Sequence, residues 1–297
     1  MFPMGIATGN TYLLKPSERT PGASMILAEL AQEAGLPAGV LNVIHGGHEA
    51  VNFLCDTPEV KAISFVGGNK AGLHIHSRGT ANGKRVQSNM GAKNHATILP
   101  DADKETTLNQ LTAAGFGAAG QRCMALSVAL FVGESKNWIP EIAARAKGLR
   151  VGAGTDPKAD LGPLISAESK ARVLSLIASA EKEGAKIVLD GRNVKVDGFP
   201  NGNFVGPTLI TGVTADMQCY KEEIFGPVLL CVEVDTLDDA IAFTNRSPYG
   251  NGCAIFTTSG GAARKYQYEI DVVRAHYTHS KRIRALCACA ATLSLEV

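Results

Sequence analysis

The sequence predicts an α/β protein with a doubly wound, mostly parallel sheet. In its first third, short runs rich in β-branched and apolar residues cover 11–14, 39–46 and 60–68, and a helical pattern follows each run, beginning at residues 20, 48 and 69. Buried strands that alternate with helices pair in parallel through right-handed crossovers. The first region is therefore a candidate nucleotide-binding domain.

The alternation resumes beyond residue 90 and predicts a second α/β region. Strands are expected over 126–132, 185–189, 227–234 and 252–258, and helices over 102–114, 138–149, 166–184, 236–245 and 260–269. The last 26 residues, 272–297, begin with basic residues and histidines, end with a short apolar run, and fit neither region. We expect a boundary near residue 90 and a divergent tail after residue 271.

Composition and charge favour a small-molecule partner. The 297 residues carry 29 basic and 28 acidic side chains, a net charge of +1, so no overall field attracts nucleic acid or an anionic membrane. Seven cysteines without framework spacing indicate free thiols in a reducing compartment. The first residues show no signal or transit pattern, and no apolar run reaches the roughly 20 residues of a membrane helix.

Two strand ends could hold a dinucleotide. Lys15 and Glu18, in KPSE, follow the first strand, where a lysine can donate to ribose hydroxyls and a glutamate can accept from a 2′-hydroxyl, which favours NAD over NADP. Gly68, in FVGGNKAG, precedes a helix whose N-terminus would attract a pyrophosphate. From spacing alone, an ordinary strand-to-helix turn is the more common interpretation of each motif.

The glycine-rich stretch FGAAGQRCMA contains the candidate nucleophile, Cys123. The preceding Arg122 would favour the reactive thiolate, or could bind a substrate carboxylate with two hydrogen bonds. A lone cysteine can also be a small buried hydrophobic residue. No metal site is expected, because His74 and His76 cannot face one ligand and Cys287 and Cys289 lack a second pair.

Six motifs in order and spacing together resemble the aldehyde dehydrogenase superfamily. They are KPSE, GLPAGVLNVIHG, FVGGNKAG, GAK, GQRC and KEEIFGPV, and the match runs from Met1 to about residue 271. The stretches SNMGAKNH and FGAAGQRCMA are similar to the CoA-acylating branch. The resemblance implies a partial Rossmann-type NAD-binding domain over 1–90 and an α/β catalytic domain over 91–271. The family's preceding part, with further strands of the NAD domain and the oxyanion asparagine, would lie before Met1.

The resemblance also implies residue roles. Cys123 corresponds to the nucleophile that attacks the aldehyde carbonyl, and Arg122 to a partner for a substrate carboxylate. At the adenosine end of NAD, the resemblance implies that Lys15, Glu18 and Arg19 contact the ribose, and that Gly68, where the family commonly has a serine, contacts the pyrophosphate. At the nicotinamide end, it implies that Glu223 binds the ribose, Phe225 lies against the ring, and Met90 lies behind the carboxamide.

Asn89 occupies the position at which hydrolytic members carry the glutamate that activates water. An amide cannot take a proton from water, so we expect free CoA to accept the acyl group. The resemblance then implies oxidation of malonate semialdehyde or its 2-methyl form to acetyl-CoA or propionyl-CoA, in valine and pyrimidine catabolism. It also implies a homotetramer and a mitochondrial location, as is usual for this family. The alternatives are a hydrolytic aldehyde dehydrogenase and an inactive homologue.

Overall fold

The computed structural model describes residues 1–273 and 275–278 and divides them into two compact units. Met1–Gly91 form the first unit, and the described residues from Ala92 to residue 278 form the second. Each unit is described below by itself.

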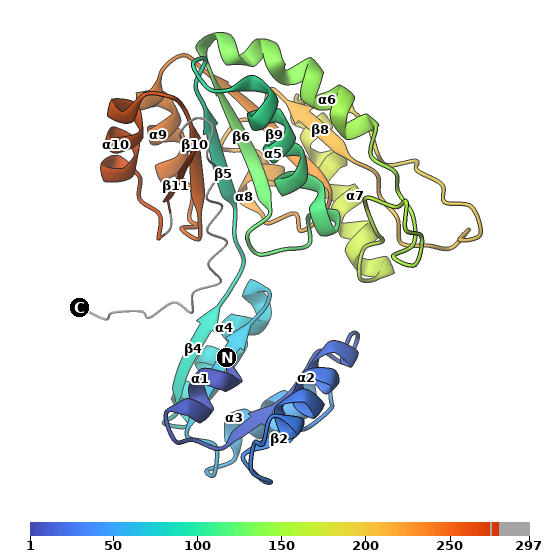
Figure 1. The fold of residues 1–297 in the computed structure, drawn as a ribbon, viewed down its shortest axis with the longest axis vertical. Coiled ribbons are helices and arrows are strands. Elements are labelled where there is room, and N and C mark those ends of the chain that lie inside the picture. Colours follow the sequence, from blue (N-terminus) through green and yellow to red (C-terminus); the bar gives the residue numbers. More distant parts are fainter. Residues whose placement is uncertain (274, 279–297) are drawn as a thin grey trace. The chain divides into compact units, whose positions relative to one another are not determined.

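The first unit contains four short strands in two separate parallel pairs. β1 pairs with β2, with Tyr12 opposite Leu41, and β3 pairs with β4, with Ala62 opposite Arg85. Its elements are α1 (Phe2–Ala7), β1 (Tyr12–Leu14), α2 (Gly22–Glu33), β2 (Leu41–Val43), α3 (His48–Asp56), β3 (Ala62–Val66), α4 (Asn69–Ala81) and β4 (Arg85–Asn89) (Figure 1). The predicted parallel pairing is present, but within Met1–Gly91 it forms two sheets of two strands.

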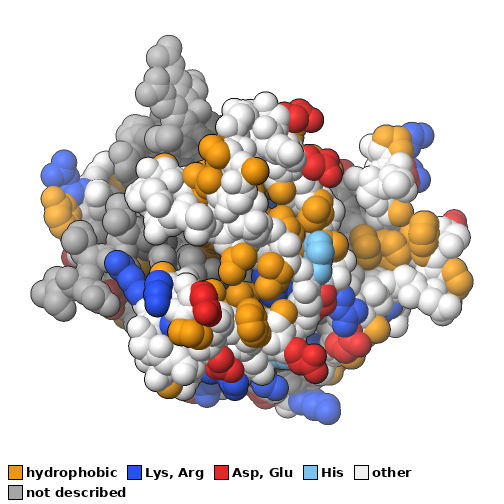
Figure 2. All heavy atoms as spheres, turned by 90° about the horizontal axis from the view of Figure 1, so that it is seen from below, with side chains coloured by type: hydrophobic (Ala, Val, Ile, Leu, Met, Phe, Trp, Pro, Cys, Tyr) orange, Lys and Arg blue, Asp and Glu red, His pale blue; other side chains and the backbone are white. Residues whose placement is uncertain are grey.

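The first unit buries little apolar surface. Among its hydrophobic residues only Cys55 and Ile75 are fully buried. Ten of its large hydrophobic side chains are exposed: Met1, Met4, Leu13, Ile26, Leu27, Leu30, Phe53, Val66, Leu73 and Met90. Figure 2 shows hydrophobic side chains of this kind between charged ones on the surface seen from below. Burial of apolar area is the main stabilising contribution in most domains, so this unit has a small core.

The second unit is built on a seven-stranded sheet in the order β11-β10-β5-β6-β9-β8-β7. All neighbours are parallel except β7 and β8, which are antiparallel. The strands are β5 (Asn94–Ile98), β6 (Leu126–Val132), β7 (Lys186–Leu189), β8 (Thr208–Thr211), β9 (Val228–Val234), β10 (Cys253–Phe256) and β11 (Ala275–Thr278). The helices are α5 (Lys104–Phe116), α6 (Ile139–Lys147), α7 (Ala167–Lys182), α8 (Gln218–Lys221), α9 (Leu237–Asn245) and α10 (Gly260–Glu269), with short 3-10 helices η1 (Gly117–Gly120) and η2 (Gly133–Trp138) (Figure 1).

Local sequence explains why these elements form. The run LSVALFV becomes β6, which lies near the middle of the sheet and is buried over nearly its whole length. Its neighbour β9 is apolar in the same way. Four helices of this unit, α5, α7, α9 and α10, begin at side-chain caps. At α5, Asp103 accepts a hydrogen bond from the Thr106 amide, and at α9, Thr236 and Asp239 form a reciprocal capping box. The main core of the protein lies around these two strands.

Several local expectations differ from the structure. The cap of α2 is Pro21 instead of Thr20. The helices α1 and α8 and the strand β8 were not predicted, because each is only four to six residues long and leaves little periodic signal. Ala275–Thr278 pair in parallel with β10, so this part of the expected tail extends the sheet. The other tail residues, including Cys287 and Cys289, lie outside the described residues.

A buried histidine should make the second unit sensitive to acid. His95 is 1% exposed, its Nε2 lies 3.0 Å from the Tyr220 hydroxyl, and its Nδ1 makes no hydrogen bond within the described residues. Burial lowers the pKa of His95 from 6.5 to about 3. Below pH 6.5 the unfolded chain therefore binds a proton that the folded chain does not, and stability falls by up to about 1.4 kcal/mol per pH unit as the pH drops towards 3.

His95→Phe is expected to flatten this dependence between pH 6.5 and 4.5. Unfolding in urea can be followed through the chain's single tryptophan, Trp138, which packs against the core of the second unit. His48→Gln, at an exposed histidine of the first unit, serves as the control and should leave the slope unchanged. Equal slopes in His95→Phe and the unaltered chain would contradict this assignment.

Candidate active site

Cys123 differs from the other described cysteines in its exposure. Its thiol is exposed, whereas Cys55, Cys219, Cys231 and Cys253 are buried, and all five are free. Burial raises the pKa of the Cys219 thiol to about 11 and that of Cys231 to about 12, so these two thiols stay protonated. Cys123 is the described thiol that a substrate can reach.

An unusual backbone turn leads to this thiol. After α5, Ala118, Ala119 and Gly120 have φ values of 52°, 54° and 68°, all in the left-handed region. Left-handed backbone is unfavourable for alanine, so the surrounding contacts must hold these residues in place. A Cβ on Gly120 would lie 2.1 Å from the carbonyl oxygen of Gly226. The Cys123 loop is thus packed directly on the loop that follows Glu223.

Two asparagines fix the peptide group of the thiol residue. The carbonyl oxygen of Cys123 accepts hydrogen bonds from Asn94 Nδ2 at 2.8 Å and from Asn251 Nδ2 at 2.9 Å. Asn94 Nδ2 also donates to the Ala125 carbonyl at 2.8 Å. Asn94 begins β5 and Asn251 precedes β10, so the sheet itself orients the loop. Neither asparagine was recognised from the sequence, because an asparagine carries no pattern that distinguishes this role from a turn.

Arg122 lies beside the thiol and is exposed. One of its Nη2 hydrogens is donated to the Ala113 carbonyl near the end of α5 at 3.2 Å. Since a guanidinium group has five N–H donors in a planar fork, the remaining donors are available to an anionic ligand.

Glu223 lies in an irregular segment between α8 and β9. Its Oε1 accepts a hydrogen bond from the Ala92 amide at 2.9 Å. Phe225, two residues on, is 41% exposed and has a φ of 55°. The second unit therefore contains Cys123, Arg122 and Glu223, and the contact between Gly120 and Gly226 joins the two loops that carry them.

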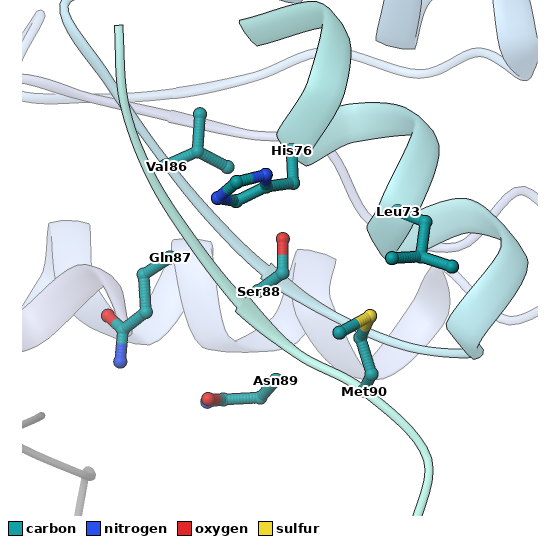
Figure 3. Close-up of a pocket in the computed structure, with 7 residues that line it drawn as sticks. All are labelled: Leu73, His76, Val86, Gln87, Ser88, Asn89 and Met90. Atoms are coloured by element: carbon teal, nitrogen blue, oxygen red, sulfur yellow. The ribbon is translucent and has the colours of Figure 1, made fainter. Parts of the chain in front are cut away.

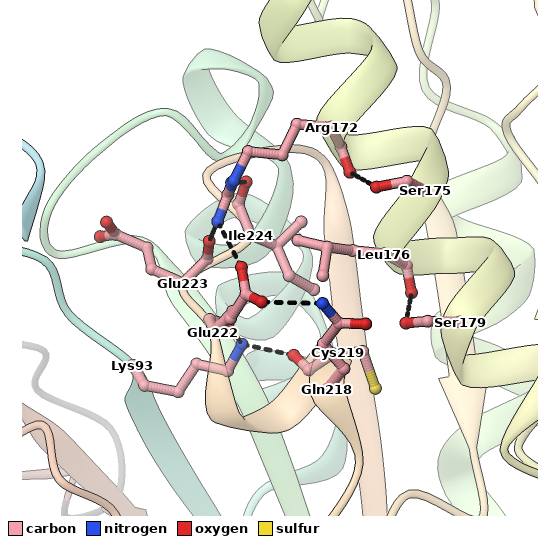
Figure 4. Close-up of polar contacts among 10 residues, drawn as sticks. All are labelled: Lys93, Arg172, Ser175, Leu176, Ser179, Gln218, Cys219, Glu222, Glu223 and Ile224. Atoms are coloured by element: carbon pink, nitrogen blue, oxygen red, sulfur yellow. Dashed lines mark hydrogen bonds and ion pairs between the residues drawn. The ribbon is translucent and has the colours of Figure 1, made fainter. Parts of the chain in front are cut away.

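Two cationic side chains, Lys93 and Arg172, support the Glu223 segment from different sides (Figure 4). The Lys93 ammonium, on a residue that is 1% exposed, donates to the carbonyls of Cys219, at 2.6 Å, and Glu222. Arg172, on α7, donates to the carbonyls of Ile224, at 2.9 Å, and Glu223. Sequence reasoning missed both residues, because neither the burial of a lysine nor a contact across 50 residues is visible in a local pattern.

The first unit holds the residues expected at the adenosine ribose. Lys15 follows β1, and its Nζ donates to the carbonyls of Pro16 at 2.7 Å and Gly46 at 2.9 Å. Glu18 lies 3.9 Å from the Lys15 ammonium, and Arg19 follows it; both are exposed. Lys15 and Glu18 thus occupy the carboxyl end of a parallel strand pair, where ligands of such sheets bind.

Gly68 is the N-cap residue of the 13-residue helix α4. No side chain caps this end, its first turn holds no acidic residue, and a Cβ on Gly68 would meet no atom within 4 Å. Open space in front of uncapped helix amides suits an anion. The amides at the start of α4 therefore suit the pyrophosphate of a dinucleotide. Lys15 and Glu18 suit its ribose hydroxyls.

Asn89, the last residue of β4, and Met90, which follows it, line a pocket of about 400 Å³ (Figure 3). The lining residues come from α4, from β4 and from the position after it: Leu73, His76, Val86, Gln87, Ser88, Asn89 and Met90. Gln87 and Asn89 point away from α4, whereas His76 and Ser88 lie on the side of that helix. The Met90 side chain packs against Gly72, where a Cβ would come within 2.5 Å of it. Asn89 is exposed and presents an amide at this position.

The described part of the chain offers neither a metal-binding cluster nor a membrane-spanning helix. No group of three or more His, Cys, Asp or Glu side chains could hold a metal ion there. None of its helices has the length and apolar character needed to cross a membrane.

Comparison with known proteins gives consistent results. The model of the "Aldehyde dehydrogenase family" matches residues 1–285, which extends past the boundary near residue 271. The Homo sapiens methylmalonate-semialdehyde/malonate-semialdehyde dehydrogenase (acylating, mitochondrial) is 64% identical over 272 residues, and a Dictyostelium discoideum relative assigned the same name is 70% identical over 273 residues. These alignments cover 92% of this chain and 51% and 52% of the relatives, so the chain spans about half the length of the curated relatives it matches.

Solved structures of the same family have a similar fold. The methylmalonate-semialdehyde dehydrogenase of Oceanimonas doudoroffii superposes with a TM-score of 0.90 at 48% identity. A Sinorhizobium meliloti protein assigned as the same enzyme, and solved as a complex with NAD, gives a TM-score of 0.90 at 46% identity. Both alignments cover 93% of this chain and 57% of the solved chain. The expected fold class is confirmed, and the chain belongs to the aldehyde dehydrogenase family.

Proposed function

We propose that this chain carries the thiol site and part of the NAD site of a CoA-acylating semialdehyde dehydrogenase. The observation that carries the proposal is the exposed Cys123 thiol on a loop whose backbone is fixed by Asn94 and Asn251. A nucleophile gains from such preorganisation, because the reacting atom is already placed before the substrate arrives. The names of the relatives at 64% and 70% identity support the same reaction class.

The proposed chemistry begins at the sulfur of Cys123. Its thiolate attacks the aldehyde carbon, and the carbonyl oxygen becomes the oxyanion of a thiohemiacetal. When bound, NAD supplies the acceptor for the hydride that leaves this carbon. The carbonyl then re-forms as a thioester on Cys123. Arg122 is placed to hold a carboxylate on the substrate, which suits malonate semialdehyde and its 2-methyl form.

Seven residues are proposed to bind NAD, by the roles that the family resemblance implies. Lys15, Glu18 and Arg19 would contact the adenosine ribose, the α4 amides after Gly68 the pyrophosphate, and Met90 the carboxamide. Glu223 would accept from the nicotinamide ribose, since only one of its carboxylate oxygens is used by the Ala92 amide. Phe225, exposed beside it, offers an aromatic face to the ring.

Asn89 supports release of the acyl group to CoA. Its amide nitrogen has no basic lone pair, so it cannot activate water against the thioester. The thiolate of CoA attacks the thioester carbon instead, and the sulfur of Cys123 leaves as a thiolate. Before this transfer, the malonyl-type thioester on Cys123 loses its carboxylate as CO2, and the enolate carbon that remains takes up a proton. The acyl group passed to CoA is then acetyl or propionyl. By the names of the relatives, we propose a mitochondrial setting.

The test combines the purified chain with malonate semialdehyde and NAD, with and without CoA. We expect NADH and acyl-CoA when CoA is present, and NADH limited to one equivalent of Cys123 when CoA is absent. Asn89→Glu should add slow, CoA-independent release of free acid. Steady formation of free acid by the unaltered chain would favour the hydrolytic alternative, and no NADH under either condition would favour an inactive homologue.

A further inference from the structure

The segment that carries Glu223 has almost no backbone support of its own. Residues 222–226 lie between α8 and β9 and belong to no helix or strand. The carbonyls of Glu222, Glu223 and Ile224 accept from cationic side chains. A carbonyl of irregular backbone must find a donor from elsewhere when it is withdrawn from water.

Lys93 and Arg172 supply those donors from different parts of the fold. Lys93 precedes β5 and donates to the carbonyl of Cys219, within α8, and to that of Glu222, the residue that follows this helix. Arg172 reaches from α7 to the carbonyls of Glu223 and Ile224 and lies 3.4 Å from the Glu222 carboxylate. Gln218 Nε2 completes the group by donating to Glu222 Oε1 at 2.9 Å. Figure 4 shows the two cations approaching the segment from different sides.

Burial of the Lys93 side chain costs free energy, so a lysine at this position needs a role that an apolar residue could not fill. A lysine that is 1% exposed loses most of its hydration, and methionine could fill the same space without that penalty. What methionine cannot do is donate to carbonyls. Hydrogen bonds from charged donors are roughly twice as strong as those from neutral donors. Two cationic side chains can therefore hold a segment that lacks the backbone hydrogen bonds of a helix or a sheet.

We propose that Lys93 and Arg172 are positioning residues that hold the 222–225 segment so that the Glu223 carboxylate and the Phe225 ring stand ready for the nicotinamide end of NAD. This inference rests on the proposed function, because it assigns Glu223 to the dinucleotide. It adds two residues that touch neither the cofactor nor the substrate.

The cofactor affinity of two variants tests the proposal. Lys93→Met and Arg172→Met should each weaken NADH binding about tenfold, measured as a dissociation constant by NADH fluorescence, which needs no turnover. Arg172→Lys, which keeps the charge but loses the planar fork, should recover part of the affinity. Arg192→Met is the control, because Arg192 pairs with Asp190 and Glu181 and should leave affinity unchanged.

The affinity should also depend on pH through Lys93. Burial lowers the pKa of Lys93 from 10.5 to about 7, so the ammonium loses its charge as the pH rises through 7. The charged and titratable groups that face it are the Cys219 thiol, the carboxylates of Glu222 and Glu223, the Arg172 guanidinium and the His95 ring. NADH binding by the unaltered chain is expected to weaken between pH 6.5 and 8.5, and Lys93→Met should remove this step.

Cleavage of the segment separates failure of this inference from failure of the proposed function. Phe225 is exposed, so chymotrypsin should cut after it faster in Lys93→Met and Arg172→Met than in the unaltered chain or Arg192→Met. Equal cleavage and equal NADH affinity in all four proteins would overturn the inference. Faster cleavage in a chain that binds no NADH even when unaltered would instead overturn the NAD assignment of the proposed function.

Discussion

From the proposed chemistry, Cys123→Ala is expected to lower NADH formation from the semialdehyde by at least about a thousandfold while leaving the fold intact. Removal of a covalent nucleophile eliminates the thiohemiacetal and every later step. The thiol is exposed, so its loss creates no cavity and should change stability by less than about 0.5 kcal/mol.

The measurement is the NADH burst in a stopped-flow experiment, together with alkylation by iodoacetamide followed peptide by peptide. In the unaltered chain the peptide that contains Cys123 should react before those of the four buried cysteines. Cys55→Ala, at a buried thiol of the first unit, is the matched control and should keep the burst. A burst of undiminished size in Cys123→Ala would remove this residue from the mechanism.

Gly120→Ala is expected to destabilise the second unit by about 3 kcal/mol and to displace the Cys123 loop. The left-handed φ of 68° costs alanine about 1–2 kcal/mol. The new Cβ would also lie 2.1 Å from the Gly226 carbonyl oxygen, and a backbone atom cannot rotate away as a side chain could. Relief of that overlap requires the loops of Cys123 and Glu223 to separate, at a further cost of about 1–3 kcal/mol.

A second glycine isolates the two effects. Gly212 has a φ of 69°, but a Cβ there would meet no atom within 4 Å, so Gly212→Ala carries the backbone cost alone. Urea unfolding followed at Trp138 gives both free energies, and the alkylation rate of Cys123 reports the loop. Equal destabilisation by Gly120→Ala and Gly212→Ala, with unchanged alkylation, would show that the close approach to Gly226 has no structural importance.

The sequence predicted regular elements well where apolar runs were long. The runs that became β6 and β9 lie in the sheet within a residue of their expected bounds, because a continuous buried strand leaves an unbroken apolar signal. The four-residue β8 between Gly206 and Gly212 left too little signal to be recognised.

The candidate site was predictable where it rests on motifs and unpredictable where it rests on geometry. The glycine-rich neighbourhood made Cys123 a candidate only, and its assignment as the nucleophile comes from the family resemblance and stays a prediction. The left-handed turn at Ala118 and Ala119 was not predicted, since alanine has no preference for that conformation. The burial of Lys93 depends on how α8 is placed against β5, which is set by tertiary packing and not by neighbouring letters.

The short strand pairs of the first unit bear on how the chain behaves in solution. Within the described residues β1, β2, β3 and β4 each have one neighbour, so each leaves a row of backbone groups open to another strand. Exposed apolar side chains such as Leu13 and Val66 lie on these strands. Edges of this kind pair readily between molecules. Aggregation of the protein in solution should therefore become faster as its concentration rises, because it begins with an encounter between two copies.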